Sequence, residues 1–491
     1  MSDSNDEIGR VTTGVEGLDV ITRGGLPAGR VTLVSGGTGA GKTVLCGQFI
    51  AVGARTGNPG IYVTCEEPTR KLVRNFDALG LGMSGLLDEG KVRFVDASPA
   101  VGMETQTTGG YDLSGLLARV KAAADEIGAE RVALDSTSAL LSQLGQPEAL
   151  RTSLHHLSNA LSEGGITTVM TSEQSGGDLS RFGLEEFVSD NVLLLTGAQP
   201  GGQRRTIQVI KMRGADHLEG PFPLTIRGGR GMHVITLASA RLHKRIGTHR
   251  VGTGSSGVDE MLNGGLPQGA ILLVSGATGT GKTLVATHFT AGGIDNDDRT
   301  LFLSYEESPD QLISNASGWG YDFEGAIDSD KLRMISEYPE AATLEDHLVD
   351  ITELIDDWKP DRLVVDTLSA LERIGTGEGF REFLIGLTAA IRESGITALL
   401  TSHSPIMGGV GVTESHVSAV TDAIVLLRYV EAPGELQRAI AILKMRGGDH
   451  DPRIRRFTIT ETGMNVGEPF AHAGVLGAVP PWSSGMPQGD S

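Results

Sequence analysis

Residues 14–43 read GVEGLDVITRGGLPAGRVTLVSGGTGAGKT, and residues 254–283 read GSSGVDEMLNGGLPQGAILLVSGATGTGKT. The two stretches share a pair of glycines, an apolar run and a glycine-rich ending that leads into Lys-Thr. Self-similarity over so long a period indicates a duplicated domain, because solenoid repeats are much shorter. The fold of the whole chain therefore follows from the fold of one copy.

Four further blocks recur in the same order in both halves. They are IYVTCEEP (61–68) and LFLSYEES (301–308), RVALDSTSALL (131–141) and RLVVDTLSALE (362–372), ITTVMTSEQS (166–175) and ITALLTSHSP (396–405), and IQVIKMRGADH (207–217) and IAILKMRGGDH (440–450). We therefore expect a first domain at 1–235, a linker at 236–252, a second domain at 253–462 and a flexible, Gly- and Pro-rich tail at 463–491.

Composition narrows the class of protein. The 491 residues include 61 Asp and Glu against 41 Lys and Arg, a formal charge of -20. Such acidity disfavours a general nucleic-acid-binding surface and suits a protein from a salty, halophilic cytoplasm. Cys46 and Cys65 are too few for a disulfide framework or a thiolate metal site. No leader or membrane-spanning run is evident, so we expect a soluble cytoplasmic protein without membrane partners.

Two stretches fit the phosphate-binding pattern G-x4-G-K-[ST], at 36–43 and 276–283. Each follows an apolar run and opens a helical pattern, so a glycine turn that binds nothing is the weaker interpretation. Lys42 and Lys282 are expected to reach the β- and γ-phosphates of ATP, and Thr43 and Thr283 to hold Mg²⁺. The nucleotide-contacting residues of the two loops are Gly37, Thr38, Gly39, Ala40, Gly41, Lys42 and Thr43, and Thr278, Gly279, Thr280, Gly281, Lys282, Thr283 and Leu284.

Short apolar runs alternate with amphipathic stretches in each copy, for example 131–135 and 166–171 against 113–127. This alternation is typical of α/β proteins with a buried parallel sheet. Together with the phosphate loops it predicts two tandem RecA-like P-loop NTPase domains, each with a mostly parallel central sheet flanked by helices. In such sheets ligands bind at the carboxyl ends of the strands.

Carboxylates follow two of these strands. Asp135 and Asp366 each end an apolar strand and are expected to hold the magnesium ion, although an Asp there can also be a simple helix cap. The pairs Glu66–Glu67 and Glu306–Glu307 follow another strand, and one Glu of each pair should face the nucleotide as the catalytic base. Which of the two faces inward stays open, as does the alternative of two solvated carboxylates opening a helix.

A cationic pair ends the last repeated block in each copy. Lys211-Met212-Arg213 and Lys444-Met445-Arg446 close alternating apolar runs, so Lys and Arg share one face of the strand. Two cations on one face suit a γ-phosphate, and we expect it to belong to an adjacent subunit, with the Arg acting as an arginine finger. An ordinary exposed strand end is the alternative.

These blocks, from Val11 to about Thr462, resemble the KaiC family of circadian-clock ATPases and their archaeal relatives. The second half carries the strongest likeness, in YEES, in SGWG at 317–320, in YPE followed by LEDHL, and in TESHVSAVTDAIVLLRYVE. The resemblance implies a homohexamer of two stacked rings with ATP bound between subunits, a slow ATPase in the first domain and an autokinase in the second, with possible regulatory protein partners. It extends the nucleotide site to His217 in the first domain and to Trp319, Gly447 and His450 in the second. Glu306 is expected as a further metal ligand.

The resemblance also implies phosphorylation sites. The phosphorylated pair of the family falls on Ser418 and Ala419, so one hydroxyl of the pair is missing, and a two-site ordered cycle cannot run. Thr413 matches a nearby threonine to which phosphate can move. Asp449 replaces a tryptophan beside the nucleotide, and the tail does not resemble the family's partner-binding peptide. His403 and His416 are interpreted as structural, because neither has a second ligand at metal spacing.

Three functions fit these residues. The first is a homohexameric ATPase and serine/threonine autokinase in signalling or timing. The second is a DNA-dependent motor or recombinase of RecA type, which the acidic composition disfavours. The third is a non-catalytic scaffold in which bound ATP only joins the subunits.

Overall fold

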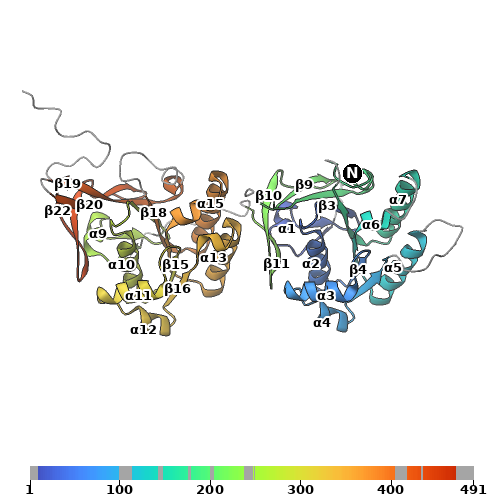
Figure 1. Cartoon of the computed structure of the whole chain (residues 1–491), viewed down its shortest axis with the longest axis horizontal. Coiled ribbons are helices and arrows are strands. Elements are labelled where there is room, and N and C mark those ends of the chain that lie inside the picture. The colour runs from blue at the N-terminus through green and yellow to red at the C-terminus, as the bar shows by residue number, and fades with distance from the viewer. Residues whose placement is uncertain are drawn as a thin grey trace, which may run out of the picture. The chain divides into compact units, whose positions relative to one another are not determined.

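Each half of the chain is built around a nine-stranded sheet. The structure is a computed structural model that describes residues 9–98, 113–141, 147–174, 178–198, 204–236, 247, 249–403, 417–432 and 435–470. The chain separates into two units, Met1–Ser239 and Ala240–Ser491. Figure 1 shows the two units, each with helices packed around its sheet.

The first sheet has a parallel part and an antiparallel part. Strands β5, β4, β6, β7, β3 and β8 run parallel, and β9, β10 and β11 continue the sheet antiparallel beyond β8. The strands in chain order are β3 (Val31–Gly36), β4 (Gly60–Thr64), β5 (Val92–Asp96), β6 (Arg131–Asp135), β7 (Thr167–Glu173), β8 (Asn191–Thr196), β9 (Thr206–Met212), β10 (Pro221–Arg227) and β11 (Gly231–Val234). A small hairpin of β1 (Arg10–Val11) and β2 (Leu26–Pro27) precedes them.

Helices pack on both faces of this sheet. They are α1 (Leu18–Ile21), α2 (Lys42–Arg55), α3 (Thr69–Ala78), α4 (Met83–Asp88), α5 (Leu113–Ile127), α6 (Thr137–Leu141), α7 (Pro147–Glu163) and α8 (Glu185–Val188). Residues that are neighbours along β4 belong to different hydrophobic clusters, since Tyr62 packs with α2 and α3 while Ile61 and Val63 pack with α5 and α7. A strand covered on both faces needs apolar residues at every position, which explains the continuous apolar runs of the sequence.

The second unit repeats the same topology. Its sheet order is β16-β15-β17-β18-β14-β19-β20-β21-β22, again parallel as far as β19 and antiparallel beyond it. The strands are β14 (Ile271–Gly276), β15 (Thr300–Ser304), β16 (Leu332–Ser336), β17 (Arg362–Asp366), β18 (Thr397–His403), β19 (Ala423–Ala432), β20 (Glu435–Met445), β21 (Arg455–Thr460) and β22 (Gly463–Pro469), with β12 (Arg250–Val251) and β13 (Leu266–Pro267) as the small hairpin. The helices are α9 (Ser256–Met261), α10 (Lys282–Asp295), α11 (Pro309–Gly318), α12 (Phe323–Asp328), η1 (Pro339–Ala341), α13 (Leu344–Trp358), α14 (Leu368–Glu372) and α15 (Gly377–Ser394). The prediction of two tandem RecA-like α/β domains is confirmed.

The ends of the second unit differ from those expected from composition. Strand β22 begins at Gly463, where we expected the flexible tail, and it pairs antiparallel with β21. Gly463 has a φ of 97°, which suits a glycine in the turn between the two strands. The prediction from composition that a tail begins at Gly463 was therefore wrong, because a paired strand begins there. At the other end, β12 lies inside the expected linker and pairs with β13.

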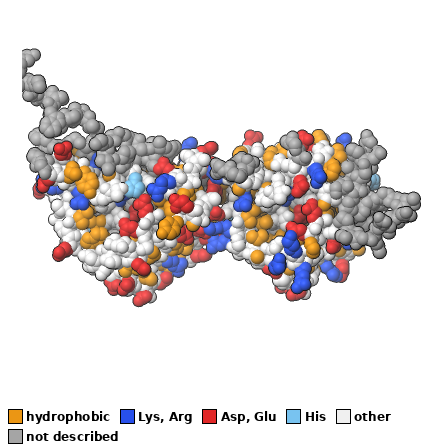
Figure 2. Space-filling model, viewed as in Figure 1, with side chains coloured by type: hydrophobic (Ala, Val, Ile, Leu, Met, Phe, Trp, Pro, Cys, Tyr) orange, Lys and Arg blue, Asp and Glu red, His pale blue; other side chains and the backbone are white. Residues whose placement is uncertain are grey.

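Charged side chains of both signs cover both units. Acidic groups and Lys or Arg side chains are interspersed on the face that Figure 2 shows. Cys46 and Cys65 are buried and free, as expected for core thiols. None of the helices in the described part of the chain combines the length and apolar character that crossing a membrane would require.

Candidate functional site

The glycine-rich loops connect the central strand of each sheet to the helix behind it. In the first unit the loop joins β3 to α2, and in the second it joins β14 to α10. Gly41 and Gly281 cap these helices with φ values of 108° and 104°, a left-handed conformation that favours glycine. A Cβ atom on Gly41 would also lie 2.6 Å from Ile226 Cδ1. The local conformation therefore requires glycine at this position of the pattern.

The two loop lysines lie along their own loops. Lys42 Nζ donates hydrogen bonds to the carbonyl oxygens of Gly36 (2.7 Å) and Gly37 (3.0 Å), and Lys282 Nζ donates to that of Ala277 (3.1 Å). Burial lowers the pKa of both lysines, and the neighbouring carboxylates oppose this shift. Each ammonium is thus held at the loop that would receive the phosphates. Thr38, Gly39, Thr278 and Gly279 are exposed at the loop tips, whereas Leu284 packs in the core.

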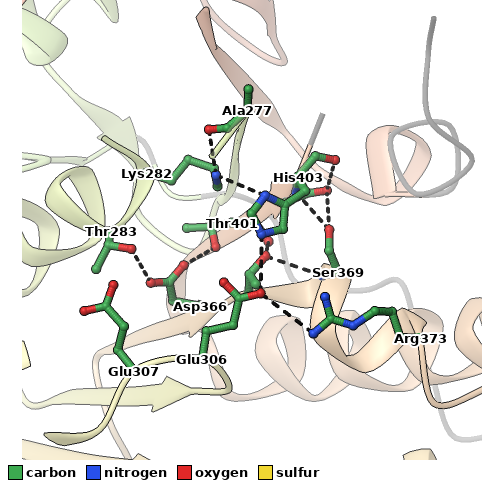
Figure 3. Close-up of polar contacts among 12 residues, drawn as sticks. Ala277, Lys282, Thr283, Glu306, Glu307, Asp366, Ser369, Arg373, Thr401 and His403 are labelled. Atoms are coloured by element: carbon green, nitrogen blue, oxygen red, sulfur yellow. Dashed lines mark hydrogen bonds and ion pairs between the residues drawn. The ribbon is translucent and has the colours of Figure 1, made fainter. Parts of the chain in front are cut away.

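The carboxylate expected to hold magnesium meets the loop threonine in the second unit. Thr283 Oγ1 donates a hydrogen bond of 2.8 Å to Asp366 Oδ2, and Thr401 Oγ1 donates to Asp366 Oδ1. Burial is the main cause that raises the pKa of Asp366. Figure 3 shows Thr283 and Asp366 facing one another beside Glu306 and Glu307. The sheet thus brings together residues that are 83 positions apart.

In the first unit the equivalent carboxylate, Asp135, has other hydrogen-bond partners. Asp135 ends β6 and accepts hydrogen bonds from Tyr62 Oη (2.8 Å) and Thr171 Oγ1 (2.6 Å). Thr171 occupies the position of Thr401 in the second unit, so this hydroxyl–carboxylate contact is common to both units.

The donor set fits a magnesium ion held together with a nucleotide. Mg²⁺ in NTPases is bound by one or two protein oxygens and by substrate phosphates, rather than by a complete protein cage. Thr283 and Asp366 provide such oxygens next to the loop. In keeping with that, the described residues contain no group of three His, Cys, Asp or Glu able to hold a metal by themselves.

The two glutamates of each pair have different surroundings. Glu66 Oε1 accepts a 2.6 Å hydrogen bond from Ser136 Oγ, next to Asp135, whereas Glu67 forms a 2.8 Å ion pair with Lys71 on α3. In the second unit the first glutamate, Glu306, also turns toward the strand ends.

Glu306 and Glu307 differ in their electrostatics. Glu306 Oε1 lies 3.4 Å from His403 Nε2 and 3.9 Å from Arg373 Nη2, and the hydrogen bond from His403 is the largest influence that lowers the pKa of Glu306. Glu307 Oε2 accepts a bond of 3.3 Å from Asn315 Nδ2. Burial raises the pKa of Glu307, and Asp366 and Glu306 raise it further.

His403 is a site residue that the sequence interpretation missed. It ends β18 opposite Gly276, the first residue of the loop, and its ring lies between Lys282 and Glu306. The repeat alignment carried the signal, because Glu173 occupies the same position opposite Gly36 in the first unit. A position where one copy has an acid and the other an imidazole marks a difference between the two sites.

The cationic pairs lie at the sheet edge that the amino ends of the parallel strands form, opposite to the edge that carries the phosphate loops. Met212 pairs with Asn191, and Asn191 pairs with Thr32 at the start of β3, while the loop follows Gly36 at its end. Four strand residues span about 13 Å. The same pairing recurs at Met445, Ala423 and Leu272 in the second unit. The fold therefore separates these cations from the loop of their own unit.

Within their own unit the cations bind the turn that precedes β8 or β19. Lys211 Nζ donates to the carbonyl oxygens of Glu186 (3.0 Å) and Ser189 (2.6 Å). Lys444 Nζ donates to the equivalent carbonyls of Ser418 (2.6 Å) and Thr421 (2.7 Å).

The arginine of each pair also lies against this turn. Arg446 donates to the carbonyl of Ala419 (3.1 Å) and lies 3.8 Å from Asp422. Arg213 lies 3.9 Å from Asp190. Met212 is buried and Met445 half-buried, while the Lys and Arg of each pair contact the same turn.

The remaining expected site residues lie away from the loops of their own units. His217 and His450 are half-buried beyond the cationic pairs, and Gly447 follows Arg446 with a φ of 74°. Trp319 follows α11, whose ten residues place it about 15 Å from the glutamate pair. Ser418 lies in a helical turn at 417–420, and Thr413 lies outside the described residues.

A phosphate loop between the central strand and its helix, a carboxylate at the end of the next strand but one in the sheet, and a glutamate beside it together define the P-loop NTPase class, here of RecA type and present twice. The family model described as "ATPase: KaiC" matches the chain over residues 11–239 and again over 251–470. The chain therefore belongs to the KaiC family of ATPases, which confirms the resemblance seen in its sequence motifs.

Relatives match nearly the whole chain. "Circadian clock protein KaiC3" of Synechocystis sp. is 43% identical over 484 residues, covering 98% of this chain and 96% of that protein. "Circadian clock oscillator protein KaiC" of Thermosynechococcus vestitus is 42% identical over 483 residues, covering 97% and 93%. The protein of the same name from Synechococcus elongatus is 42% identical over 469 residues, covering 94% and 90%.

Proposed function

We propose that this protein is a homohexameric ATPase that hydrolyses ATP in its first domain and phosphorylates itself on serine or threonine in its second. The observation that carries the proposal is the Thr283–Asp366 contact beside Glu306, which unites the parts that phosphoryl transfer needs. The names of the relatives favour a role in signalling or circadian-type timing, with regulatory protein partners.

Each residue of the second site has a defined part in this reaction. Lys282 and the backbone amides of 278–283 would bind the β- and γ-phosphates, and Thr283 and Asp366 would hold Mg²⁺. Bound Mg²⁺ supplies positive charge that stabilises the transferred phosphoryl group. Glu306 is the proposed base, because it lies beside Asp366 with its carboxylate held by His403, whereas Glu307 contacts Asn315 on α11.

The first site has the same loop, with Asp135 as the metal-holding carboxylate and Glu66 as the base. Glu66 lies at the strand ends, where it accepts a hydrogen bond from Ser136, while Glu67 forms an ion pair with Lys71. We therefore assign the water-activating role to Glu66.

The cations support a site shared between subunits. Lys444 and Arg446 lie at the far edge of their own sheet, so they cannot reach the loop of their own unit. A neighbouring subunit in a ring can place such an edge against the next loop, where Arg would stabilise charge on the γ-phosphate. Lys211 and Arg213 would serve the first ring in the same way.

Ser418 is the proposed phosphate acceptor in the second domain. It lies half-buried in the turn that Lys444 and Arg446 hold, so it belongs to the same sheet edge as the cations. A subunit that presents these cations to the next loop would present Ser418 with them. Thr413 is the alternative acceptor.

Incubation of the full-length protein with γ-labelled ATP and Mg²⁺, followed by mapping of the label, tests this function. We expect label on Ser418 or Thr413, and its loss in a Lys282→Ala variant. ATP consumption without any label would reduce the assignment to a plain ATPase. Assembly by ATP with neither label nor hydrolysis would support the scaffold, and stimulation by added DNA would support the motor.

A further inference from the structure

The imidazole of His403 connects the loop lysine to the candidate base. Its Nδ1 lies 3.4 Å from Lys282 Nζ, and its Nε2 lies 3.4 Å from Glu306 Oε1. Figure 3 shows the ring between these two side chains. The backbone N–H of His403 donates 2.8 Å to Ser369 Oγ, which fixes the end of the strand. The ring is therefore placed by the sheet rather than by a flexible loop.

The chemistry of the two neighbours defines the tautomer. An ammonium group can only donate, so Nδ1 must accept from Lys282, and the ring proton of a neutral imidazole then lies on Nε2. That N–H is directed at Glu306, a carboxylate that can only accept while ionised. Lys282, His403 and Glu306 thus form one directional chain of hydrogen bonds, with Arg373 as a second cation near the carboxylate.

The first unit holds its glutamate by another device. Glu66 accepts from the hydroxyl of Ser136 at 2.6 Å, and the position of His403 is taken by Glu173. Glu173 adds negative charge near Lys42, whereas His403 adds a hydrogen-bond donor for the base. The two repeats therefore share their phosphate loops and differ in the group that orients the glutamate.

We infer that His403 is the positioning residue of the second site. It orients Glu306 toward the acceptor hydroxyl, and it links Glu306 to the loop lysine through its two ring nitrogens. The inference rests on the proposed function of Glu306. In the transfer step the acceptor oxygen bonds to the γ-phosphorus, its proton passes to Glu306, and the bond to the β,γ-bridging oxygen breaks to release ADP. His403 acts through Glu306 and takes no proton itself.

Three substitutions of His403 distinguish a role in orienting Glu306 from a role in packing alone. The amide of Gln reaches the place of Nε2, so His403→Gln keeps a donor toward Glu306. The amide of Asn reaches only the place of Nδ1, so His403→Asn keeps the Lys282 contact alone, and His403→Ala keeps neither. All three are measured in the full-length protein for phosphate incorporation and for binding of a fluorescent ATP analogue.

We expect His403→Gln to stay within about threefold of the wild-type rate, and His403→Asn and His403→Ala to lose on the order of tenfold or more in kcat. The KM for ATP should change less than about twofold, since Lys282 and the other residues of the phosphate loop are retained in all three variants. Equal rates for all variants, or equal losses that include His403→Gln and a raised KM, would overturn the inference.

A second readout separates this inference from the autokinase proposal. In a Glu66→Gln background the remaining ATP hydrolysis reports on the second site. If the wild type incorporates no phosphate, the autokinase proposal fails, and the ranking of the three variants in this residual hydrolysis still decides the role of His403. The expected ranking is Gln above Asn and Ala, and any other ranking contradicts it.

Discussion

Lys444 Nζ lies 2.6 Å from the carbonyl oxygen of Ser418, so a cation proposed to serve one nucleotide also holds the turn that carries the proposed phosphate acceptor. The equivalent lysine of the first unit, Lys211, makes the same bonds to the carbonyls of Glu186 and Ser189. The contact is thus part of the fold of both repeats, and the position of Ser418 is occupied by Glu186 in the first repeat.

Replacing Lys444 should loosen this turn. Lys444→Met removes two hydrogen bonds from a charged donor that is partly exposed, which we expect to cost about 1 kcal/mol of unfolding free energy. Hydrogen exchange should accelerate at 417–422 and stay unchanged elsewhere in the unit. Lys211→Met, the matched control, should give the same local effect at 185–190. Unchanged exchange in both variants would show that the bonds do not hold the turns.

The two glutamates of the second site should differ in effect. Glu306→Gln removes the proposed base and should lower the rate of phosphate incorporation about 100-fold. Glu307→Gln should lower it much less, because Glu307 contacts Asn315 on α11. Initial rates with labelled ATP measure both variants. A larger loss for Glu307→Gln would reverse the assignment of the base.

The stability of the second unit should depend on His288. This buried ring accepts a 2.9 Å hydrogen bond from the N–H of Met464 and contacts Tyr321 Oη at 2.6 Å. Burial lowers the pKa of His288, so the neutral ring is favoured in the folded state. The contribution of His288 to the free energy of unfolding is fully present above its unfolded pKa of about 6.5. This contribution is lost as the pH falls from that value through the lower pKa of the folded state.

The first repeat supplies the matched variant for this test. Gln48 occupies the corresponding position and accepts a 2.8 Å bond from the N–H of Met232. A His288→Gln variant should therefore keep the contact to β22 and lose less stability than the wild type between pH 7 and pH 5. Urea unfolding at a series of pH values measures the difference. Parallel pH profiles would show that His288 is not the group that titrates.

Arg131 and Arg362 are buried at the start of the equivalent strands β6 and β17. Arg362 forms a 2.8 Å ion pair with Asp298 and donates to the carbonyls of Gly252 (2.8 Å) and Phe289 (3.1 Å). Arg362→Met leaves these acceptors without their donor and should cost about 3 kcal/mol. Arg381→Met, at an exposed position, should stay within about 0.5 kcal/mol by the same denaturation measurement. A loss below 1 kcal/mol for Arg362→Met would contradict the role given to this ion pair.

The repeats made the fold and the phosphate loops predictable. Residues 36–43 and 276–283 carry a local pattern whose backbone conformation depends on glycine, so the sequence alone places them. The carboxylates could be assigned because the carboxyl ends of parallel strands share one edge. The contact between Thr283 and Asp366 follows from that rule.

Other features depend on contacts that no local pattern records. The place of His403 results from the register of β18 against β14, which brings it to Lys282 across 121 positions. The separation of Lys444 from its own loop results from the antiparallel pairing of β19 and β20. Composition also misplaced the end of the second domain, because Gly463 begins β22 and pairs with Thr460.

Mixing two inactive variants tests the shared site most directly. Lys282→Ala removes the loop lysine, and a double variant with Lys444→Ala and Arg446→Ala removes the cations at the other sheet edge. If each site combines the loop of one subunit with the cations of the next, phosphate incorporation should be nearly absent in either variant alone and recover when the two are mixed during assembly. A mixture that shows only the average of the two separate activities would contradict the shared site.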